Sequence, residues 1–288
     1  MTGKQPFFIA EVSSNHHRDL DRCFQFIDTA ARIGCDAVKF QLFKIDQLFS
    51  PEILAASEQH RQRRQWELPL SFLPELAQRC RQQGIQFSCT PFYLEAVEEL
   101  QPYVDFYKVA SYELLWDDLL SACAATAKPL VLSTGMATLD EVKHAVDVVR
   151  AINTDLTLLH CISGYPTPVE QCNLGAIQTL REACGGPVGW SDHSVSPVVL
   201  QRAVHHWGAE MIEFHLDLDE QGEEYAAGHC WLPEQIGAVI GDIRLAAEAD
   251  GSGVKAPVAV ELADRDWRAD PADGLRPLRS LRKSFSPN

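Results

Sequence analysis

The sequence predicts one (β/α)₈ barrel, a TIM barrel of the α/β class, over residues 1–250, followed by an irregular tail over residues 251–288. Eight short apolar runs recur along the chain, and amphipathic segments separate them. Eight strand–helix units are the number that closes a parallel barrel of roughly 250 residues. No G-x-G-x-x-G follows the first run, which argues against the rival fold, an open doubly wound sheet.

The eight runs are brief and mostly apolar, as strands covered on both faces must be. Each is short enough for a strand and too short for an independent helix. In order, they are FFIAEVS (7–13), AVKFQLF (37–43), FSCTPF (87–92), FYKVAS (106–111), PLVLSTG (129–135), LTLLHCIS (156–163), PVGWSDHS (187–194) and MIEFHLDLD (211–219).

The segments between the runs carry helix start and stop signals. The first opens with Asp19, an expected N-cap, and closes with Gly34, expected just past the last turn. Thr138 is followed three residues later by Glu141, which predicts a capping box at the start of a helix over residues 138–152. Similar amphipathic patterns separate the later runs, so each predicted strand is followed by a helix.

Two stretches depart from this repeat. Residues 44–67, rich in Gln and Arg, form a long excursion after the second run. Excursions of this length in a compact domain are often functional or covering elements. Residues 251–288 are rich in Pro, Gly and charged residues and show weak periodicity. We expect them to pack on or beside the barrel as an irregular tail and not to form a second domain.

The composition argues against several classes of protein. The 288-residue chain carries a net charge of −15, which disfavours nucleic acid as the main partner. No apolar run reaches the roughly 18 residues of a membrane span, and MTGKQPFFIAEV lacks the features of a signal peptide. The nine cysteines are odd in number and have no C-x-x-C spacing, so we expect free thiols and a reducing cytoplasm.

Polar side chains stand at or near the carboxyl ends of all eight predicted strands. That end of a (β/α)₈ barrel carries the active site, and each buried polar group without a partner costs about 1–3 kcal/mol. A ligand that satisfies these groups is therefore the simplest explanation of the pattern. In strand order they are Glu11, Asn15 and His16; Lys39 and Gln41; Thr90; Lys108, Ser111 and Glu113; Ser133 and Thr134; His160, Ser163 and Tyr165; Ser191, Asp192 and His193; and His215 and Asp217.

The types of these side chains indicate the kind of ligand. Lys39 stands inside the apolar run AVKFQ, and an interior lysine needs an anionic partner. Together with Lys108 and the hydroxyl groups, it suits a phosphate and a carboxylate. His193 and His215 stand on neighbouring strands and suit a divalent metal ion. The alternative is structural, because a single histidine near a strand end more often serves the fold than a metal.

The blocks around these residues resemble, in order and spacing, the signature blocks of the sialic acid synthase family. This family comprises N-acetylneuraminate synthases and their relatives for legionaminic and pseudaminic acids. The resemblance covers residues 7 to about 250, and STGMAT, YPTP and SDH in this order are together its most specific part. The remaining blocks are IAEVSSNHHRD, DAVKFQLFK, FSCTPF, YKVASYE, LLHCISG and IEFHLDLD.

The resemblance implies a metal-dependent condensation of phosphoenolpyruvate with an N-acylated hexosamine such as N-acetylmannosamine, giving a nine-carbon 2-keto acid and phosphate. It places a divalent ion on His193 and His215, with Mn²⁺ expected and Mg²⁺ or Co²⁺ as alternatives. It implies that Glu11 transfers a proton or orients the attacking water. The expected catalytic residues are Glu11, Lys39, Lys108 and Tyr165, and the expected substrate-binding residues are Gln41, Thr90, Ser111, Glu113, Ser133, Ser163 and Ser191.

Several stretches depart from the family pattern. Arg18 stands where the family usually has glycine, and Tyr112 adds a bulky ring. After the eighth strand, where the family has a G-P-D-H-like stretch, this chain has GEEY (222–225) followed by AAGHCWLP (226–233). His229 and Cys230 in that segment have no assigned role. Family members typically continue into a small antifreeze-like domain that lends an arginine to a partner's active site, and we expect this chain to lack it. Either another chain carrying that domain then supplies the contact, or a local residue such as Arg18 substitutes, or the acceptor differs. A homodimer is a further expected partner.

Two other functions stay open at this stage. One is a related phosphoenolpyruvate-dependent synthase, or an aldolase, that uses a different aldehyde acceptor, which the altered sugar-side blocks favour. The other is a barrel without catalysis that serves as a binding subunit. The retained Glu11, both lysines and both histidines argue against the loss of catalysis.

Overall fold

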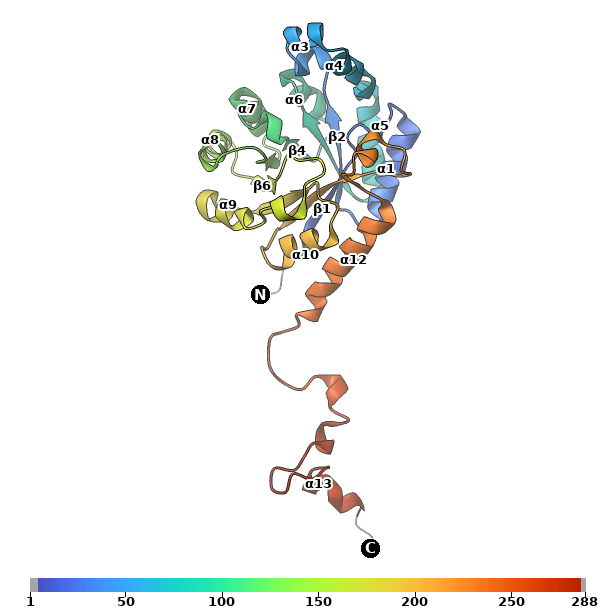
Figure 1. The fold of residues 1–288 in the computed structure, drawn as a ribbon, viewed down its shortest axis with the longest axis vertical. Helices are drawn as coiled ribbons and strands as arrows, with labels where there is room; N and C mark the ends of the chain where they lie inside the picture. The colour runs from blue at the N-terminus through green and yellow to red at the C-terminus, as the bar shows by residue number, and fades with distance from the viewer. Residues whose placement is uncertain (1–4, 286–288) are drawn as a thin grey trace. The chain divides into compact units, whose positions relative to one another are not determined.

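The computed structural model describes residues 5–285 and confirms the predicted closed barrel of eight parallel strands (Figure 1). Strands β1 to β8 pair in chain order, and β8 pairs with β1 to close the ring. Each strand begins within one residue of its predicted start. The strands are β1 (Phe7–Glu11), β2 (Ala37–Leu42), β3 (Gln86–Pro91), β4 (Phe106–Val109), β5 (Leu130–Ser133), β6 (Leu156–Cys161), β7 (Val188–Asp192) and β8 (Met211–Leu216).

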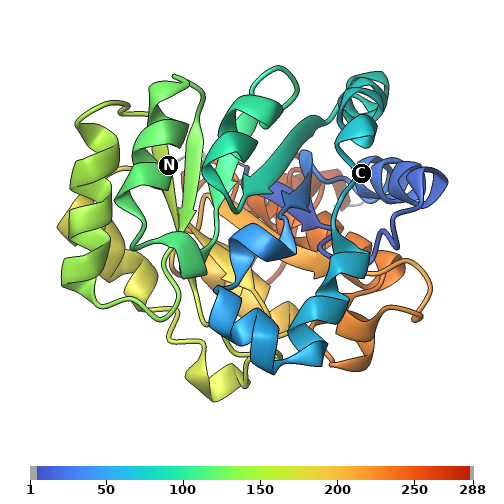
Figure 2. The same cartoon turned by 90° about the horizontal axis from the view of Figure 1, so that it is seen from above.

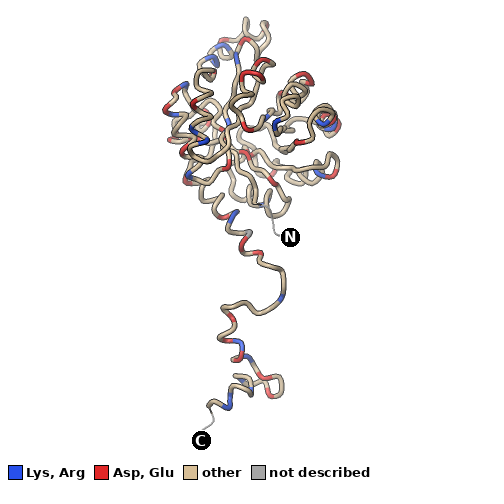
Figure 3. Tube along the Cα trace, turned by 180° about the vertical axis from the view of Figure 1, so that it is seen from behind, with Lys and Arg blue, Asp and Glu red and all other residues tan. Residues whose placement is uncertain are grey.

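Helices surround the strands, as two perpendicular views show (Figures 1 and 2). Acidic and basic residues both occur on the outside of the barrel (Figure 3). Among residues 5–285, none of the helices has both the length and the apolar character that a bilayer span requires. The main helices are α1 (Leu20–Arg32), α5 (Leu73–Gln83), α6 (Leu94–Leu100), α7 (Asp117–Ala125), α8 (Leu139–Arg150), α9 (Ala176–Cys184), α10 (Pro197–His205) and α12 (Pro233–Ala249).

The predicted caps of these helices are confirmed. The Asp19 carboxylate accepts hydrogen bonds from two backbone N–H groups in the first turn of α1, and Gly34 follows that helix with a φ of +90°. Thr138 and Glu141 form the reciprocal capping box of α8. These local signals fix where two of the outer helices begin or end.

Short elements connect the barrel units at the strand ends. The predicted excursion over residues 44–67 folds into α2 (Ile45–Leu48), α3 (Pro51–Ala56), α4 (Glu58–Gln62) and the 3₁₀ helix η1 (Arg63–Trp66). The 3₁₀ helices η2 (Leu70–Phe72), η3 (Ser111–Glu113) and η4 (Val169–Gln171) and the short helix α11 (Glu223–Ala226) are further connections. After α11, a two-residue strand, β9 (Cys230–Trp231), pairs in parallel with the end of β8 and was not predicted.

The interior of the barrel changes from apolar to polar along the strands. Five side chains form an apolar cluster near the amino ends of the strands: Ile9, Ala37, Phe106, Val131 and Leu159. Side chains of a strand alternate between its two faces, so the residue two positions later also points inward. Those residues are Glu11, Lys39, Lys108, Ser133 and Cys161. The apolar layer thus forms a floor, and the polar layer above it faces the carboxyl ends.

A larger apolar core fills the space between the strands and the helices. Its buried residues come from the outward faces of the strands and the inward faces of α1 and α5 to α10, together with part of α12. This layer fixes the helices to the ring of strands and so positions the strand ends.

The chain divides into two compact units, the second of which begins at Ala249. Within residues 249–285 the regular elements are η5 (Ala259–Glu261), η6 (Arg265–Trp267), α13 (Arg279–Arg282) and η7 (Lys283–Phe285). The Asp270 carboxylate accepts a hydrogen bond from the backbone N–H of Arg279 at 2.8 Å. The expected packing of residues 251–288 on or beside the barrel stays a prediction.

Candidate active site

A cavity of about 760 Å³ opens at the carboxyl ends of the strands. Residues from all eight barrel strands or the loops that follow them line it, which is the position expected for the active site of this fold. The excursion over residues 44–67 supplies part of the wall through Leu48, Phe49, Arg63 and Trp66. It therefore covers the site, as its length predicted.

Nearly all the predicted site residues come together in this cavity. Those that line it are Lys39, Gln41, Thr90, Lys108, Ser111, Glu113, Ser133, Tyr165, Ser191, His193 and His215. Glu11 and Ser163 are not among the lining residues. Glu11 is ion-paired with Lys39, and its Oε1 accepts a hydrogen bond from Gln41 at 2.8 Å. Glu11 therefore contacts two residues that do face the cavity.

Two buried lysines and two buried glutamates form the charged centre of the site. The Lys108 ammonium lies 3.2 Å from Glu213 Oε1, and the Lys39 ammonium lies 3.8 Å from the same oxygen and also contacts Glu11. Burial by itself would lower the pKa of Lys39, but the two carboxylates raise it above the ordinary lysine value. Burial would raise the pKa of Glu213, but Lys108 and Lys39 hold it below its usual range. Lys39 and Glu213 are therefore both charged at neutral pH.

Hydroxyl groups lie around the two lysines. Thr90 Oγ1 accepts a hydrogen bond from the Lys39 ammonium at 3.2 Å, and Ser191 Oγ donates to Glu213 at 3.3 Å. Ser133 Oγ is buried and has no hydrogen-bond partner among the described residues. Lysines and hydroxyls together are the groups that bind phosphate or carboxylate oxygens.

The turn after β5 brings the backbone of Gly135 close to Ser111. The Gly135 N–H donates to Ser111 Oγ at 2.9 Å. A Cβ at Gly135 would lie 2.4 Å from Ser163 Oγ and 2.9 Å from both Cys161 Sγ and Ser111 Oγ. Only glycine leaves room for these three atoms, so packing alone requires glycine at position 135.

Glu113 and Tyr165 lie on another wall of the cavity. Burial raises the pKa of Glu113 to about 7, although Lys108 acts in the opposite direction. Its Oε2 is buried and has no hydrogen-bond partner within the described part of the chain. The ring centroid of Tyr165 lies 4.1 Å from that of His193 and 5.0 Å from that of His229. Tyr165 thus packs against imidazoles while part of its ring remains exposed.

His193 and His215 lie side by side, with ring centroids 5.4 Å apart. His193 Nδ1 lies 2.7 Å from the carbonyl of Ile162, to which it donates. Burial, with a smaller contribution from His215, lowers the pKa of His193 to about 3, so its ring is neutral and Nε2 carries the lone pair. For His215 burial opposes protonation, but Glu224, whose Oε2 lies 2.8 Å from Nδ1, raises the pKa above its usual value.

Asp192 organises the end of β7 without contacting His193. Its carboxylate accepts hydrogen bonds from the indole N–H groups of Trp190 and Trp231, each at 3.0 Å. It also accepts from the backbone N–H and hydroxyl of Ser194 and from the backbone N–H of Val195. The buried carboxylate therefore holds β7, β9 and the loop after β7 in one arrangement.

Sequence reasoning gave no role in the site to Glu213, Glu224 or His229. Glu213 stands two positions before His215 in β8, so the alternation of strand faces could have placed it inside the barrel beside Lys39. Glu224 and His229 come from α11 and the turn before β9, where no periodicity marks an inward position. Their proximity to His215 follows only from the folded chain.

Arg18 does not take the expected place of an arginine in the cavity. Its side chain is exposed, donates to the carbonyl of Arg64, and does not line the cavity. Its backbone has a φ of +55°, which explains why glycine suits this position in the family pattern. The arginine that does line the cavity is Arg63, from η1.

The fold and the cavity define a (β/α)₈ barrel with buried lysines and histidines at the carboxyl ends of its strands. The NeuB family pattern matches residues 26–255, and the chain belongs to the NeuB family. This confirms the resemblance to sialic acid synthases.

Relatives with sequence and structural similarity agree with this placement. The chain is 37% identical over 98% of its length to an uncharacterized protein of Methanocaldococcus jannaschii, of which it covers 82%. It is 34% identical over 90% of its length to the N,N'-diacetyllegionaminic acid synthase of Legionella pneumophila, of which it covers 77%. A crystal structure of the N-acetylneuraminic acid synthetase of Leptospira borgpetersenii, in complex with citrate, is 30% identical and superposes with a TM-score of 0.81 over 94% of each chain.

Proposed function

We propose that this protein condenses phosphoenolpyruvate with an N-acylated hexosamine, N-acetylmannosamine or a relative, to give a nine-carbon 2-keto acid and phosphate. The observation that carries the proposal is the pair of buried lysines, Lys39 and Lys108, which line a cavity at the active-site end of a NeuB-family barrel. The names of similar proteins include legionaminic, pseudaminic and N-acetylneuraminate-9-phosphate synthases.

The charged centre would bind the three-carbon substrate. Phosphoenolpyruvate carries a phosphate and a carboxylate, and the buried Lys39 and Lys108 would neutralise them. The hydroxyls of Thr90, Ser133 and Ser191, and Ser111 with its N–H partner Gly135, would supply hydrogen bonds. Glu213 would keep both lysines charged and oriented before the substrate arrives, because it pairs with both.

Gln41, Glu113 and Tyr165 would face the sugar acceptor. The raised pKa of Glu113 keeps part of its population protonated near neutral pH, so it can both donate and accept hydrogen bonds to hydroxyls. Glu11 would act through its contacts with Lys39 and Gln41, either by orienting the attacking water or by taking up a proton. Arg63 and Trp66 on the covering segment would limit the length of the acceptor.

His193 and His215 fit the divalent ion that the family implies, Mn²⁺ or, as alternatives, Mg²⁺ or Co²⁺. The fit rests on the hydrogen bond of His193 Nδ1 to the Ile162 carbonyl, which leaves Nε2 free to act as a ligand. When bound, such an ion polarises the aldehyde of the open-chain sugar.

The carbon–carbon bond would form between C3 of phosphoenolpyruvate and the aldehyde carbon. Positive charge then develops at C2, water adds there, and phosphate leaves from the tetrahedral intermediate. Lys39 and Lys108 would stabilise the negative charge of the phosphate and carboxylate throughout these steps.

The test is phosphate release by the purified protein with Mn²⁺ and phosphoenolpyruvate. We expect turnover only when an N-acylated hexosamine is added, and none in His215→Ala, whereas His205→Ala, an exposed position on α10, serves as the matched control. No consumption of phosphoenolpyruvate with any N-acylated hexosamine would contradict the proposed reaction. Undiminished turnover in His215→Ala would remove the metal assignment.

A different aldehyde acceptor on the same site is the second candidate. Glu224 and His229 stand on the cavity wall in the segment that replaces the family's G-P-D-H-like stretch, and this is the observation that favours it. A screen of aldoses with the same phosphate assay separates the two, because the acceptor that supports turnover identifies the substrate.

A further inference from the structure

One arginine faces the cavity without a carboxylate beside it. Within residues 5–285, Arg63 of η1 is the only arginine that lines the cavity, and none of the ion pairs in this part of the chain includes it. The neighbouring arginines of the same segment are paired: Arg61 with Glu58, and Arg64 with Asp46 at 2.7 Å. Of these three arginines, Arg63 is therefore the one whose charge is available to a ligand in the cavity.

Two aromatic rings hold the Arg63 guanidinium. Its Cζ lies 5.7 Å from the ring centroid of Phe49 and 5.7 Å from that of Trp66. Both aromatic residues also line the cavity. A guanidinium within about 6 Å of the face of a ring is stabilised by cation–π attraction, and this contact does not use its N–H groups. The rings therefore restrain the guanidinium, and its N–H groups can bind a planar anionic group.

The segment that carries Arg63 is fastened between its two ends. The backbone N–H of Ile45, at the start of α2, donates to the Glu67 carboxylate at 2.7 Å. The pair of Arg64 with Asp46 joins η1 to α2. Contacts within the folded segment therefore hold Arg63 over the cavity before any ligand binds.

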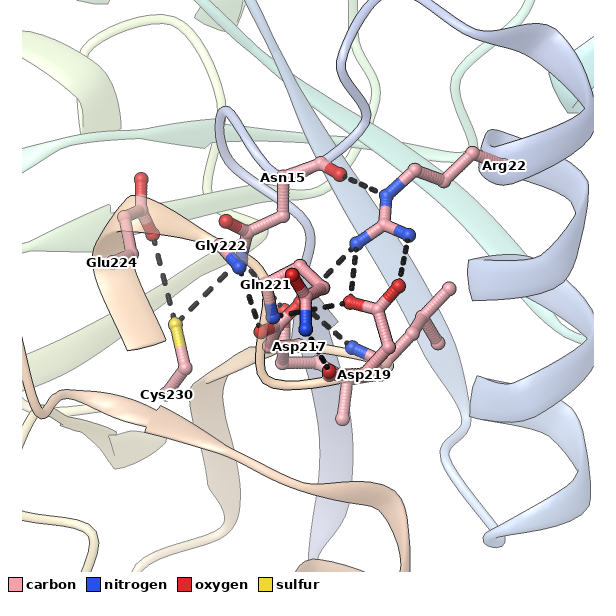
Figure 4. A network of polar contacts seen from close by, with 10 residues as sticks. Asn15, Arg22, Asp217, Asp219, Gln221, Gly222, Glu224 and Cys230 are labelled. Atoms are coloured by element: carbon pink, nitrogen blue, oxygen red, sulfur yellow. Dashed lines mark hydrogen bonds and ion pairs between the residues drawn. The ribbon is translucent and has the colours of Figure 1, made fainter. Parts of the chain in front are cut away.

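A second arginine close to the site, Arg22, shows the opposite arrangement (Figure 4). It pairs with Asp219 at 2.8 Å and with Asp217 at 3.3 Å, and its Nε donates to the carbonyl of Asn15 at 2.6 Å. It is not among the residues that line the cavity. An arginine that serves the fold is thus surrounded by carboxylates here, whereas Arg63 stands at the cavity without one.

The proposed reaction fixes which end of the acceptor faces Arg63. Lys39 and Lys108, above the apolar floor, would hold the phosphate and carboxylate of phosphoenolpyruvate. The aldehyde carbon of the acceptor must reach C3 of that molecule, so the aldehyde end points inward and the other end points to the mouth. The cavity of about 760 Å³ lies in the upper part of the roughly 300–1,000 Å³ range of ligand sites, which leaves room for both reactants.

We propose that Arg63 binds an anionic group, a phosphate or a carboxylate, at the end of the acceptor remote from its aldehyde. The inference rests on the proposed condensation and specifies its acceptor as an acidic derivative of the sugar. A guanidinium binds either group through two parallel N–H···O bonds. A neutral acceptor would leave Arg63 without a partner, so Arg63 selects for charge.

The experiment compares three acceptors by the consumption of phosphoenolpyruvate: N-acetylmannosamine, its 6-phosphate and N-acetylmannosaminuronic acid. We expect kcat/KM at least about tenfold higher for one of the acidic acceptors than for the neutral sugar, because hydrogen bonds between charged groups are the strong ones. The acidic acceptor with the higher kcat/KM identifies the group as phosphate or carboxylate.

Arg63→Gln should reduce this preference to within about threefold by raising KM for the acidic acceptor. The KM for phosphoenolpyruvate and kcat/KM for the neutral sugar should change by less than about threefold, which a general loss of structure would not allow. Arg63→Lys keeps the charge but not the paired N–H groups and should retain part of the preference. Arg81→Gln, an exposed position on α5, makes the same change in net charge away from the cavity and is the matched control.

Calorimetry with the two acidic sugars separates the role of Arg63 from the reaction. Binding to the wild type that weakens at least about tenfold in Arg63→Gln supports the assignment, even if no acceptor is turned over. Failure of both acidic sugars to bind the wild type, or equal affinity in the variant, overturns it. Equal kcat/KM for acidic and neutral acceptors in the wild type also overturns it. Absence of turnover with every acceptor instead contradicts the condensation.

Discussion

Replacing Glu213 by glutamine should destabilise the barrel, and anions should reverse the effect. The side chains of Glu213, Lys39 and Lys108 are 3%, 3% and 6% exposed, and both lysines pair with the same carboxylate. Glutamine keeps the volume of the side chain, so the change removes charge without opening a cavity. Lys39 would retain Glu11, but Lys108 would lose the carboxylate that pairs with it.

The expected size follows from the burial of the pair. Removing one partner of a buried ion pair costs about 3–5 kcal/mol, because the other charge stays buried without compensation. In a barrel of about 250 residues, 1 kcal/mol shifts the melting temperature by roughly 2–4 °C. We therefore expect the E213Q variant to melt roughly 6–20 °C below the wild type.

Thermal unfolding with and without inorganic phosphate is the assay. Phosphate at about 100 times its dissociation constant adds about 2.7 kcal/mol to the stability of the folded state, and it should recover much of the loss. Glu234→Gln is the control, because the Arg32–Glu234 pair is exposed on both sides and contributes little. The reasoning fails if E213Q melts at the wild-type temperature and phosphate raises the melting temperature of neither protein, because the two lysines then do not form an anion-binding site.

Two further changes test the electrostatics and the floor of the site. The pKa of Glu113 is raised to about 7 by burial, so between the ordinary glutamate value and pH 7 the unfolded chain loses a proton that the folded chain keeps, and stability falls as pH rises. Glu113→Gln should remove this pH dependence, which amounts to a total change of the order of 3 kcal/mol in the free energy of unfolding, measured by denaturant titrations across this range. An unchanged pH dependence in the variant would assign it to other groups. A Cβ at Gly189 would lie 2.2 Å from the carbonyl oxygen of Met211 on β8. Gly189→Ala should therefore lower the free energy of unfolding in urea by at least roughly 1–3 kcal/mol. An unchanged free energy of unfolding would show that the two strands can separate to admit the methyl group.

The sequence was sufficient for the barrel because each strand is a local signal. A buried parallel strand is an apolar run, and the runs from Phe7 to Leu216 mark their own starts. β9 has only two residues, too few for a repeating pattern of buried positions, so the sequence did not show it. The fold was therefore predictable wherever burial produces a repeating pattern.

The same reasoning explains what could be predicted of the site. Lys39 was found because a lysine in an apolar run is unusual, and Glu213, which is equally unusual in MIEFHL, could have been found in the same way. Glu224 and His229 stand in a polar segment where charged and imidazole residues are ordinary. They lie beside His215 because the chain after β8 turns back over the end of that strand, which composition does not reveal.

The segment from Asp217 to His229 is attached to the barrel at both ends, by β8 before it and by β9 after it. Because both ends are attached, the sequence and the length of this segment can change while the register of the eight strands stays the same. The lysine half of the cavity belongs to the strands themselves and has no comparable freedom. The wall that carries Glu224 and His229 can thus change by replacement of a single connection, while the half of the cavity that carries Lys39 and Lys108 stays the same.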